Sequence, residues 1–312
     1  MGHTSSWKKV IGFVLAFCLL FCVANLPFYS LRDEGYQFIS SKRKTQQIDS
    51  LKDHILDVAF LGDSECWAAF SPLQLLGEEG IPSYNCATAG QWTGDAFILL
   101  NKVMQTQSPK VIVLETSTLY SSPNRYKYAF TQAFPIFHYH AFYRKDSNTV
   151  KDGYTLGANL VKTTEAYTGR ADYMLTETAE HPIDKLGLSK LNEIAQRCKE
   201  ENIQLVLVSS PSALTWTQGK HLAVANWCTE NAVAYVDCNE KEIMEQMGFD
   251  WSTDTRDGGD HVNLSGSKKV TAAIGRYLKK NYDLSDQREN ADYSTWLKRY
   301  QNSKLYQKGE QK

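Results

Sequence analysis

The chain has almost no net charge, since 34 lysines and arginines stand against 35 aspartates and glutamates. A protein that binds nucleic acid without sequence preference needs a clustered basic face, so this balance argues against a nucleic-acid partner. Internal repeats and low-complexity tracts are also lacking. Apolar residues make up 42% of the chain and charged residues 22%, near the averages for globular proteins, which favours a folded enzyme over a disordered segment or a binding tail.

Cysteines at metal-binding spacings are missing as well. Cys18 and Cys22 fall in an apolar segment, and the remaining cysteines are odd in number and include no C-x-x-C pair: Cys66, Cys86, Cys198, Cys228 and Cys238. Neither a zinc site nor a complete disulfide framework is therefore indicated, and we expect no metal or other cofactor. Most of these cysteines are expected to be small buried hydrophobic side chains, while one bridge, Cys228 to Cys238, stays open in an oxidising compartment.

Charged residues are absent from residues 10–31, whereas Lys8 and Lys9 precede this run and Arg32 follows it. As a helix with 1.5 Å per residue the run extends roughly 33 Å, which is enough to cross a bilayer. The two lysines favour a cytoplasmic N-terminus and an extracytoplasmic remainder. We therefore expect residues 1–31 to form a single-pass anchor in the cell membrane. A cleaved signal peptide is the alternative, although the apolar run is longer than the usual signal core.

The remainder divides into three parts by composition. Residues 32–55 are polar and suggest a juxtamembrane stalk or a first helix, and residues 56–284 hold the candidate strands and helices. Inside that domain, residues 121–182 form an insertion rich in tyrosine and phenylalanine, expected to be either a lid or a small satellite core. Residues 285–312 are highly charged and predict one surface helix and a tail.

Short apolar runs alternate with helical patterns along the central domain. Candidate strands cover residues 57–61, 83–86, 111–115, 204–209 and 234–237, and candidate helices cover residues 94–107, 189–202, 221–231 and 265–282. Most of the strands are apolar and rich in β-branched residues, as buried parallel strands are. The alternation predicts the α/β class, with a roughly five-stranded parallel sheet in a three-layer α/β/α arrangement.

Two short motifs stand at opposite ends of this pattern. Gly-Asp-Ser at residues 62–64 follows the first strand, and Asp-His-Val-Asn at residues 260–263 opens the last helix. Because a parallel sheet gathers the carboxyl ends of its strands along one edge, Ser64 and His261 are expected to meet there. A serine hydroxyl is a weak nucleophile until an imidazole accepts its proton, so the pair predicts a nucleophile and its base.

Three blocks of the chain resemble those of the SGNH hydrolase superfamily, also called GDSL esterases and lipases: Gly62-Asp63-Ser64, Asn85 to Gly90, and His261-Val262-Asn263. The resemblance implies a flavodoxin-like SGNH fold in which Ser64 is the nucleophile and His261 its base. It also implies that backbone N–H groups of Ser64 and Gly90 form an oxyanion hole, which stabilises the tetrahedral intermediate on the way to an acyl-serine.

Two positions depart from the family pattern. The third block, after residues 111–115, lacks the expected asparagine, and Ser117 is the nearest side-chain donor for the oxyanion hole. The family's aspartate stands three residues before the histidine, where this chain has a glycine. The glycines that follow Asp257 give its loop freedom to adjust, whereas Asp260 would have to fold back to reach its neighbour. Asp257 is therefore the expected partner of His261, with Asp260 in reserve.

Three further residues near strand ends have two readings each. Trp92 and Trp216 either line a sugar-binding cleft or pack in the core. Glu115 ends an apolar strand and either contacts the serine loop or is a satisfied buried carboxylate.

The departures resemble membrane-anchored SGNH-like proteins of bacterial envelopes, such as the D-alanine transfer protein of teichoic acid synthesis and alginate-type acetyltransferases. This resemblance implies an extracytoplasmic serine esterase or O-acyltransferase that acts on an acylated envelope glycan or a related small ester, with a membrane-bound acyltransferase as a partner. A non-catalytic envelope scaffold, which keeps the fold and binds glycan or a membrane partner, is the alternative.

Overall fold

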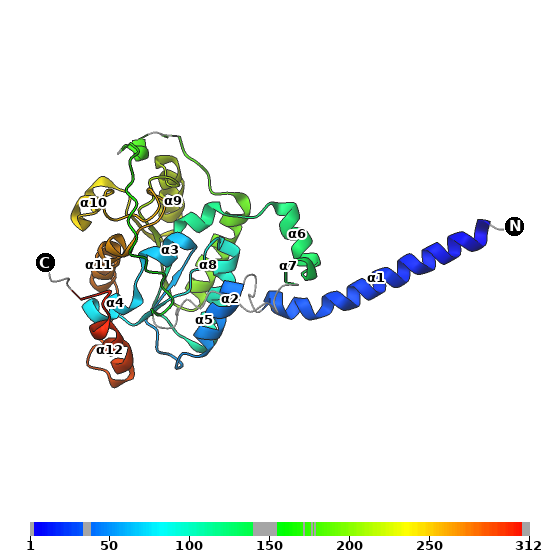
Figure 1. Cartoon of the computed structure of the whole chain (residues 1–312), viewed down its shortest axis with the longest axis horizontal. Coiled ribbons are helices and arrows are strands. Elements are labelled where there is room, and N and C mark those ends of the chain that lie inside the picture. Colours follow the sequence, from blue (N-terminus) through cyan, green and yellow to red (C-terminus); the bar gives the residue numbers. More distant parts are fainter. Residues whose placement is uncertain are drawn as a thin grey trace. The chain divides into compact units, whose positions relative to one another are not determined.

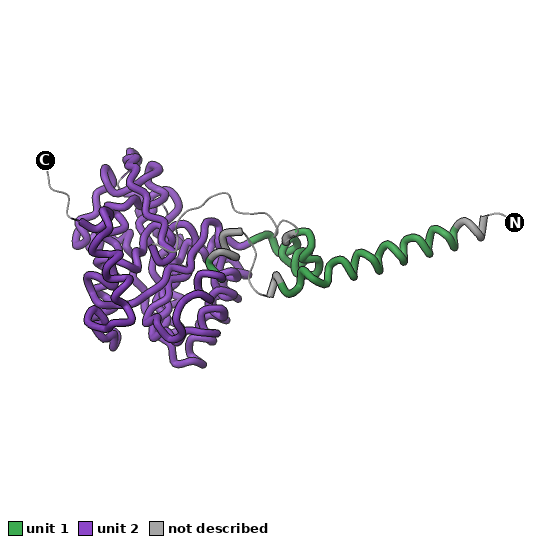
Figure 2. Tube along the Cα trace, turned by 60° about the horizontal axis from the view of Figure 1, so that its bottom comes forward, with its two compact units in different colours: residues 1–45, 123–147 green, residues 46–122, 148–312 purple. Residues whose placement is uncertain are grey.

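The structure is a computed structural model that describes residues 3–33, 39–139, 155–170, 172–175, 177 and 179–307. The chain divides into two compact units (Figure 2). Residues 1–45 and 123–147 make the first unit, and residues 46–122 and 148–312 make the second. The second unit holds the sheet and both sequence motifs.

A five-stranded parallel sheet forms the centre of the second unit, with the strand order β2-β1-β3-β4-β5. The strands are β1 (Val58–Leu61), β2 (Ser83–Asn85), β3 (Val111–Glu115), β4 (Gln204–Ser209) and β5 (Ala234–Asp237). The three inner strands are almost wholly buried, as expected of parallel strands that are covered on both faces. The predicted fold class is confirmed, and three of the five strands have the predicted bounds.

Helices cover the two faces of the sheet (Figure 1). On one face, α5 (Thr93–Thr106), α8 (Lys185–Glu200) and α9 (Gln218–Asn231) pack against strand side chains such as Ile112 and Leu207. On the other face, α10 (Lys241–Met247) and α11 (Leu264–Asn281) pack against side chains such as Val113 and Val208. Along α11, Val270, Ile274 and Leu278 are buried at helical spacing, so the predicted apolar face of this helix does meet the sheet.

Shorter elements complete the second unit: α3 (Ser64–Ala69), α4 (Pro72–Glu79), the 3₁₀ helices η1 (Thr116–Tyr120), η3 (Tyr173–Leu175) and η4 (Ala291–Tyr293), and α12 (Ser294–Asn302). α2 (Ile39–Asp49) crosses the boundary between the units. The C-terminal segment is less peripheral than its charge indicated. Tyr293 and Trp296 are buried in the main core, and the Tyr293 hydroxyl donates a hydrogen bond to the backbone carbonyl of Ile55.

Capping side chains explain why two helices begin earlier than the sequence predicts. The Asp184 carboxylate accepts hydrogen bonds from the backbone N–H groups of Leu186 and Gly187, so α8 begins at residue 185 instead of 189. The Thr217 hydroxyl accepts one from the Lys220 N–H and starts α9 at residue 218 instead of 221. All seven cysteines are free thiols, so no bridge joins Cys228 to Cys238.

The first unit combines α1 (His3–Asp33) with α6 (Arg125–Ala133) and α7 (Ile136–Tyr139). Residues 7–30 of α1 are long and apolar enough to cross a membrane. Phe21 of this helix lies 5.5 Å from Phe134 and 5.6 Å from Phe137, measured between ring centroids. The Asn25 side-chain amide donates to the Ala133 carbonyl and accepts from the Ile136 N–H. An apolar helix therefore packs against part of the insertion.

The insertion at residues 121–182 is divided between the two units. Residues 123–139 pack with α1, residues 140–154 lie outside the described residues, and residues 155–170 belong to the second unit. The last of these segments runs beside the loop that carries the histidine motif. It is bound there through backbone hydrogen bonds from Glu165 to Thr255 and from Leu264 to Val161.

Candidate active site

A sharp turn between β1 and α3 presents Ser64 at the carboxyl edge of the sheet. Gly62 adopts φ = 153°, and a Cβ atom there would stand 2.6 Å from the Cβ of Cys66 and 2.8 Å from that of Glu115, so only glycine fits. Asp63 caps α3 by accepting a hydrogen bond from the Glu65 backbone N–H at 3.2 Å. Ser64 is the first residue of the helix and is partly exposed.

His261 is fixed mainly by Asp257. One Asp257 oxygen lies 2.6 Å from His261 Nδ1, and the other accepts the His261 backbone N–H at 2.7 Å. The nearest Asp260 oxygen is 3.3 Å from the same Nδ1. Gly258 and Gly259, with φ values of 73° and 109°, make the turn that brings the first carboxylate back to the ring. The spacing argument for Asp257 agrees with this geometry, and its role in a reaction stays a prediction.

The segment at residues 155–170 also braces the histidine loop from outside. The Gly258 backbone N–H donates to the Glu165 carbonyl, and the Tyr167 N–H donates to the Trp251 carbonyl. The Thr255 hydroxyl donates to the Glu165 carbonyl as well. Asn263, the last residue of the His-Val-Asn motif, caps α11 and donates to the carbonyls of Thr253 and Thr255. The position of His261 is thus set by bonds on both sides of its loop.

Glu65 stands between the two motifs, and sequence reasoning missed it. The Ser64 hydroxyl donates to Glu65 Oε2 at 3.2 Å, and the same oxygen is 3.8 Å from His261 Nε2. Among the described residues, His261 Nε2 is buried and has no hydrogen-bond partner. The signal in the sequence was an acidic residue directly after the candidate nucleophile, in a helix whose other side chains are mostly apolar.

Ser117 bonds to carboxyl groups at the position where the family pattern has its asparagine. Its hydroxyl lies 2.5 Å from Asp63 Oδ1 and 2.6 Å from Glu115 Oε2, and its backbone N–H also donates to Glu115. Glu115 is fully buried and accepts the Ser210 N–H through its other oxygen. The predicted role of Ser117 as an oxyanion donor would require this hydroxyl to leave both carboxyl groups. Both readings of Glu115 hold, because it is a satisfied buried carboxyl group that reaches the serine loop through Ser117.

Burial raises the pKa of each carboxyl group in this cluster. The pKa of Glu65 rises to about 9, first through desolvation and then through the nearby Asp63 carboxylate. Desolvation also raises the pKa of Glu115 to about 8 and that of Asp63 to about 7. At neutral pH the cluster therefore holds protons that ordinary carboxylates would have released.

Two backbone N–H groups remain as oxyanion donors. The N–H groups of Ser64 and Gly90 form no hydrogen bond with the described residues. Gly90 is exposed, and its φ of 69° is the left-handed conformation that favours glycine. Gln91, which follows it, is fully buried and accepts the Gly62 N–H at 3.4 Å. This contact ties the Gly90 turn to the turn that carries the serine.

The two tryptophans considered for substrate binding are packing residues in this structure. Trp92 is 5% exposed, and its ring lies against Gly94 in the first turn of α5. Trp216 is 3% exposed, and its indole N–H donates to Asp237 at 2.9 Å. Neither ring offers the open face that a sugar would need, so the core alternative describes both residues.

Three side chains offer a spacing that a cation could bridge. Ligand atoms of Glu65, Asp260 and His261 lie within 4.8 Å of one another. Two of these side chains already have partners in the site: Glu65 accepts the Ser64 hydroxyl, and an Asp260 oxygen lies 3.3 Å from His261 Nδ1.

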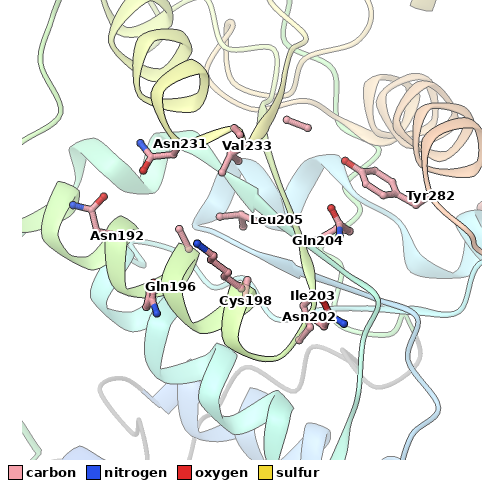
Figure 3. Close-up of a pocket in the computed structure, with 14 residues that line it drawn as sticks. Asn192, Gln196, Cys198, Asn202, Ile203, Gln204, Leu205, Asn231, Val233 and Tyr282 are labelled. Carbon is pink, nitrogen blue, oxygen red and sulfur yellow. The ribbon is translucent and has the colours of Figure 1, made fainter.

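Two cavities of the second unit lie away from the two motifs. One of about 720 Å³ opens where β4 and β5 begin, between residues such as Gln204, Asn231 and Tyr282 (Figure 3). That is the amino edge of the sheet, opposite to the edge at which Ser64 stands. Another of about 740 Å³ is lined by residues such as Tyr173 and His221.

No protein-family model matches this chain, and no curated protein matches it. Solved structures similar in fold include a GDSL-like lipase from Bacteroides thetaiotaomicron, which is 13% identical, with a TM-score of 0.43 over 78% of this chain and 100% of that one. A putative lipolytic protein of the G-D-S-L family from Desulfitobacterium hafniense is 10% identical, with a TM-score of 0.40 over 70% and 97%. A psychrotrophic esterase from Pseudoalteromonas is 11% identical, with a TM-score of 0.40 over 72% and 96%.

Proposed function

We propose that this protein is an SGNH-type serine esterase or O-acyltransferase that works through an acyl-serine intermediate. One arrangement carries the proposal. Ser64 stands at the start of α3 on the carboxyl edge of the sheet, and the Glu65 carboxyl group that it contacts lies 3.8 Å from His261, whose imidazole Asp257 orients. A carboxylate on Nδ1 leaves Nε2 as the base for a hydroxyl and stabilises the imidazolium that forms. The unoccupied N–H groups of Ser64 and Gly90 are suited to an oxyanion.

In the proposed reaction, the Ser64 oxygen attacks an ester carbonyl while its proton passes to His261 Nε2. The tetrahedral intermediate collapses, the leaving alcohol takes that proton, and an acyl-serine remains. Water then completes a hydrolysis, or the hydroxyl of a sugar completes a transfer. We further propose that α1 holds the domain at the outer face of the cell membrane, where an acylated envelope glycan or a related small ester is the substrate and a membrane-bound acyltransferase is a suitable partner.

A fluorophosphonate probe applied to the full-length protein in detergent tests the nucleophile. The probe should label the wild type at Ser64, and short-chain aryl esters should be hydrolysed. Ser64→Ala should abolish labelling and lower kcat by roughly three orders of magnitude or more. Ser121→Ala is the matched control, because Ser121 is an exposed serine directly after η1. Equal ester hydrolysis by the Ser64→Ala variant would remove this residue from the mechanism.

A non-catalytic scaffold is the second candidate, and one observation favours it. The Ser64 hydroxyl donates to Glu65 and not to His261, so the resting structure lacks the bond that activates the nucleophile. A scaffold would leave the fluorophosphonate unreacted and yet bind glycan with the same affinity in the wild type and in Ser64→Ala. Labelling of the wild type would exclude it.

A further inference from the structure

Glu65 occupies an unusual place for an acidic residue. Only 8% of its side chain is exposed, and its Oε2 atom accepts the Ser64 hydroxyl and lies 3.8 Å from His261 Nε2. A carboxylate in this place would compete with the imidazole for the serine proton. Its charge state therefore decides whether the serine and the histidine can work together.

The neighbouring cluster forces at least one proton onto a carboxyl group. Ser117 has one hydroxyl proton and lies within hydrogen-bond distance of both Asp63 and Glu115. It can donate that proton to only one of them, so the other contact requires a protonated carboxyl group as donor. Glu65 belongs to the same cluster, because its backbone N–H donates to Asp63 Oδ1 and the negative charge of Asp63 raises the pKa of the Glu65 side chain.

The other charges that face Glu65 act in both directions. Desolvation and the negative charges of Asp63 and Asp260 favour the protonated form, whereas His261 favours the ionised form. Glu115 also lies within electrostatic reach of Glu65, and the positive charges of Arg256 and Lys220 oppose the protonated form from the histidine loop and from α9. The balance keeps the pKa of Glu65 at about 9.

The two charge states of Glu65 have opposite consequences for catalysis. Ionised, it would form an ion pair with the imidazolium across 3.8 Å, stabilise that cation, and withdraw the base that Ser64 needs. Neutral, it offers Oε2 as a weak acceptor that orients the serine hydroxyl and leaves the imidazole uncharged. When Glu65 is protonated, its contact with Ser64 positions the hydroxyl. When Glu65 is ionised, its contact with His261 inhibits the base.

We propose that Glu65 is a positioning residue that works as a neutral acid: buried next to Asp63, it accepts the Ser64 hydroxyl and faces His261 without giving that imidazole a counter-ion. The proposal rests on the serine mechanism proposed above. Its distinctive consequence is that activity falls when the pH rises through the pKa of Glu65.

The pH profile of Glu65→Gln tests this in the full-length protein. Glutamine keeps an acceptor for the Ser64 hydroxyl, and it cannot ionise. Wild-type kcat/KM should fall about tenfold one pH unit above the pKa of Glu65, as a single required proton is lost. In Glu65→Gln this alkaline decline should disappear, after a loss of a few-fold at neutral pH. Asp95→Asn is the control, because it removes a different buried acid and should leave the alkaline decline in place.

Two results would overturn the proposal. One is an alkaline decline in Glu65→Gln with the same midpoint as in the wild type. The other is a loss at neutral pH as large as that of Ser64→Ala, which would make Glu65 the base itself. The infrared C=O band of a protonated carboxyl group gives a readout without activity: it should be weaker in Glu65→Gln than in the wild type at pH 7. An unchanged band would show that Glu65 is not a neutral acid. A wild-type protein that the fluorophosphonate probe does not label would instead refute the serine mechanism.

Discussion

The carboxylate of Asp257 binds His261 twice, through the ring Nδ1 and through the backbone N–H. The double contact fixes the orientation of the imidazole relative to its own backbone. Asp260, the adjacent residue, reaches only the ring and at a longer distance. This difference separates two residues that the sequence left as alternatives.

Replacing each aspartate by asparagine should therefore give unequal losses. Asp257→Asn should lower kcat by roughly 10²–10⁴-fold, because an amide stabilises the imidazolium poorly and permits the wrong tautomer. Asp260→Asn should cost less than about tenfold. Steady-state hydrolysis of an aryl ester measures both. If the ranking is reversed, Asp260 is the functional partner and the double contact of Asp257 is only structural.

Asp95 gives a prediction about stability and pH. It is buried in the first turn of α5, one of its oxygens has no partner among the described residues, and desolvation raises its pKa from 3.8 to about 8. A raised pKa means that the folded state binds the proton more tightly, so this stabilisation is complete below pH ~4 and is lost as the pH rises to about 8. Asp95→Asn should have a higher urea midpoint than the wild type at pH 9, and the difference should shrink at pH 5.

The exposed residue Glu289 provides the control for that experiment, since Glu289→Gln should follow the wild-type curve at both pH values. An Asp95→Asn curve with unchanged pH dependence would mean that the carboxyl group is hydrated in solution.

Trp216→Phe separates packing from substrate binding. The change removes the indole N–H that bonds to Asp237, and it should lower the free energy of unfolding by about 1–3 kcal/mol. KM should not change, because the ring is buried. Thermal denaturation and steady-state kinetics of the same sample decide the matter. An increased KM with wild-type stability would mean that Trp216 contributes to substrate binding and not to packing.

The apolar helix α1 predicts how the protein behaves in fractionation. The intact chain should stay with the membrane pellet after a carbonate wash, and protease added outside should digest the second unit. A soluble form that begins near residue 25 or later would instead show that the segment is a cleaved signal.

The sheet was predictable because its inner strands are buried on both faces, so apolar runs such as residues 111–115 and 204–209 mark the strands directly. Ser64 and His261 could be placed at one edge for the same topological reason. Glu65 and Ser117 could not be understood in this way, because their contacts depend on side chains that β3 and the β1 turn bring together. The division of the insertion between the two units could not be predicted either, because its aromatic composition does not indicate which helix or strand the aromatic side chains pack against.

The contact of Phe21 and Asn25 with α6 and α7 bears on how the protein can be handled. A fragment that starts after residue 33 would keep Phe130, Phe134 and Phe137 but lose the helix that packs on them. It would also leave the Ile136 N–H without its Asn25 acceptor. A newly bared aromatic surface of this kind promotes self-association. Aggregation of a fragment without α1 would then reflect this missing helix and not a defect in the domain that holds Ser64.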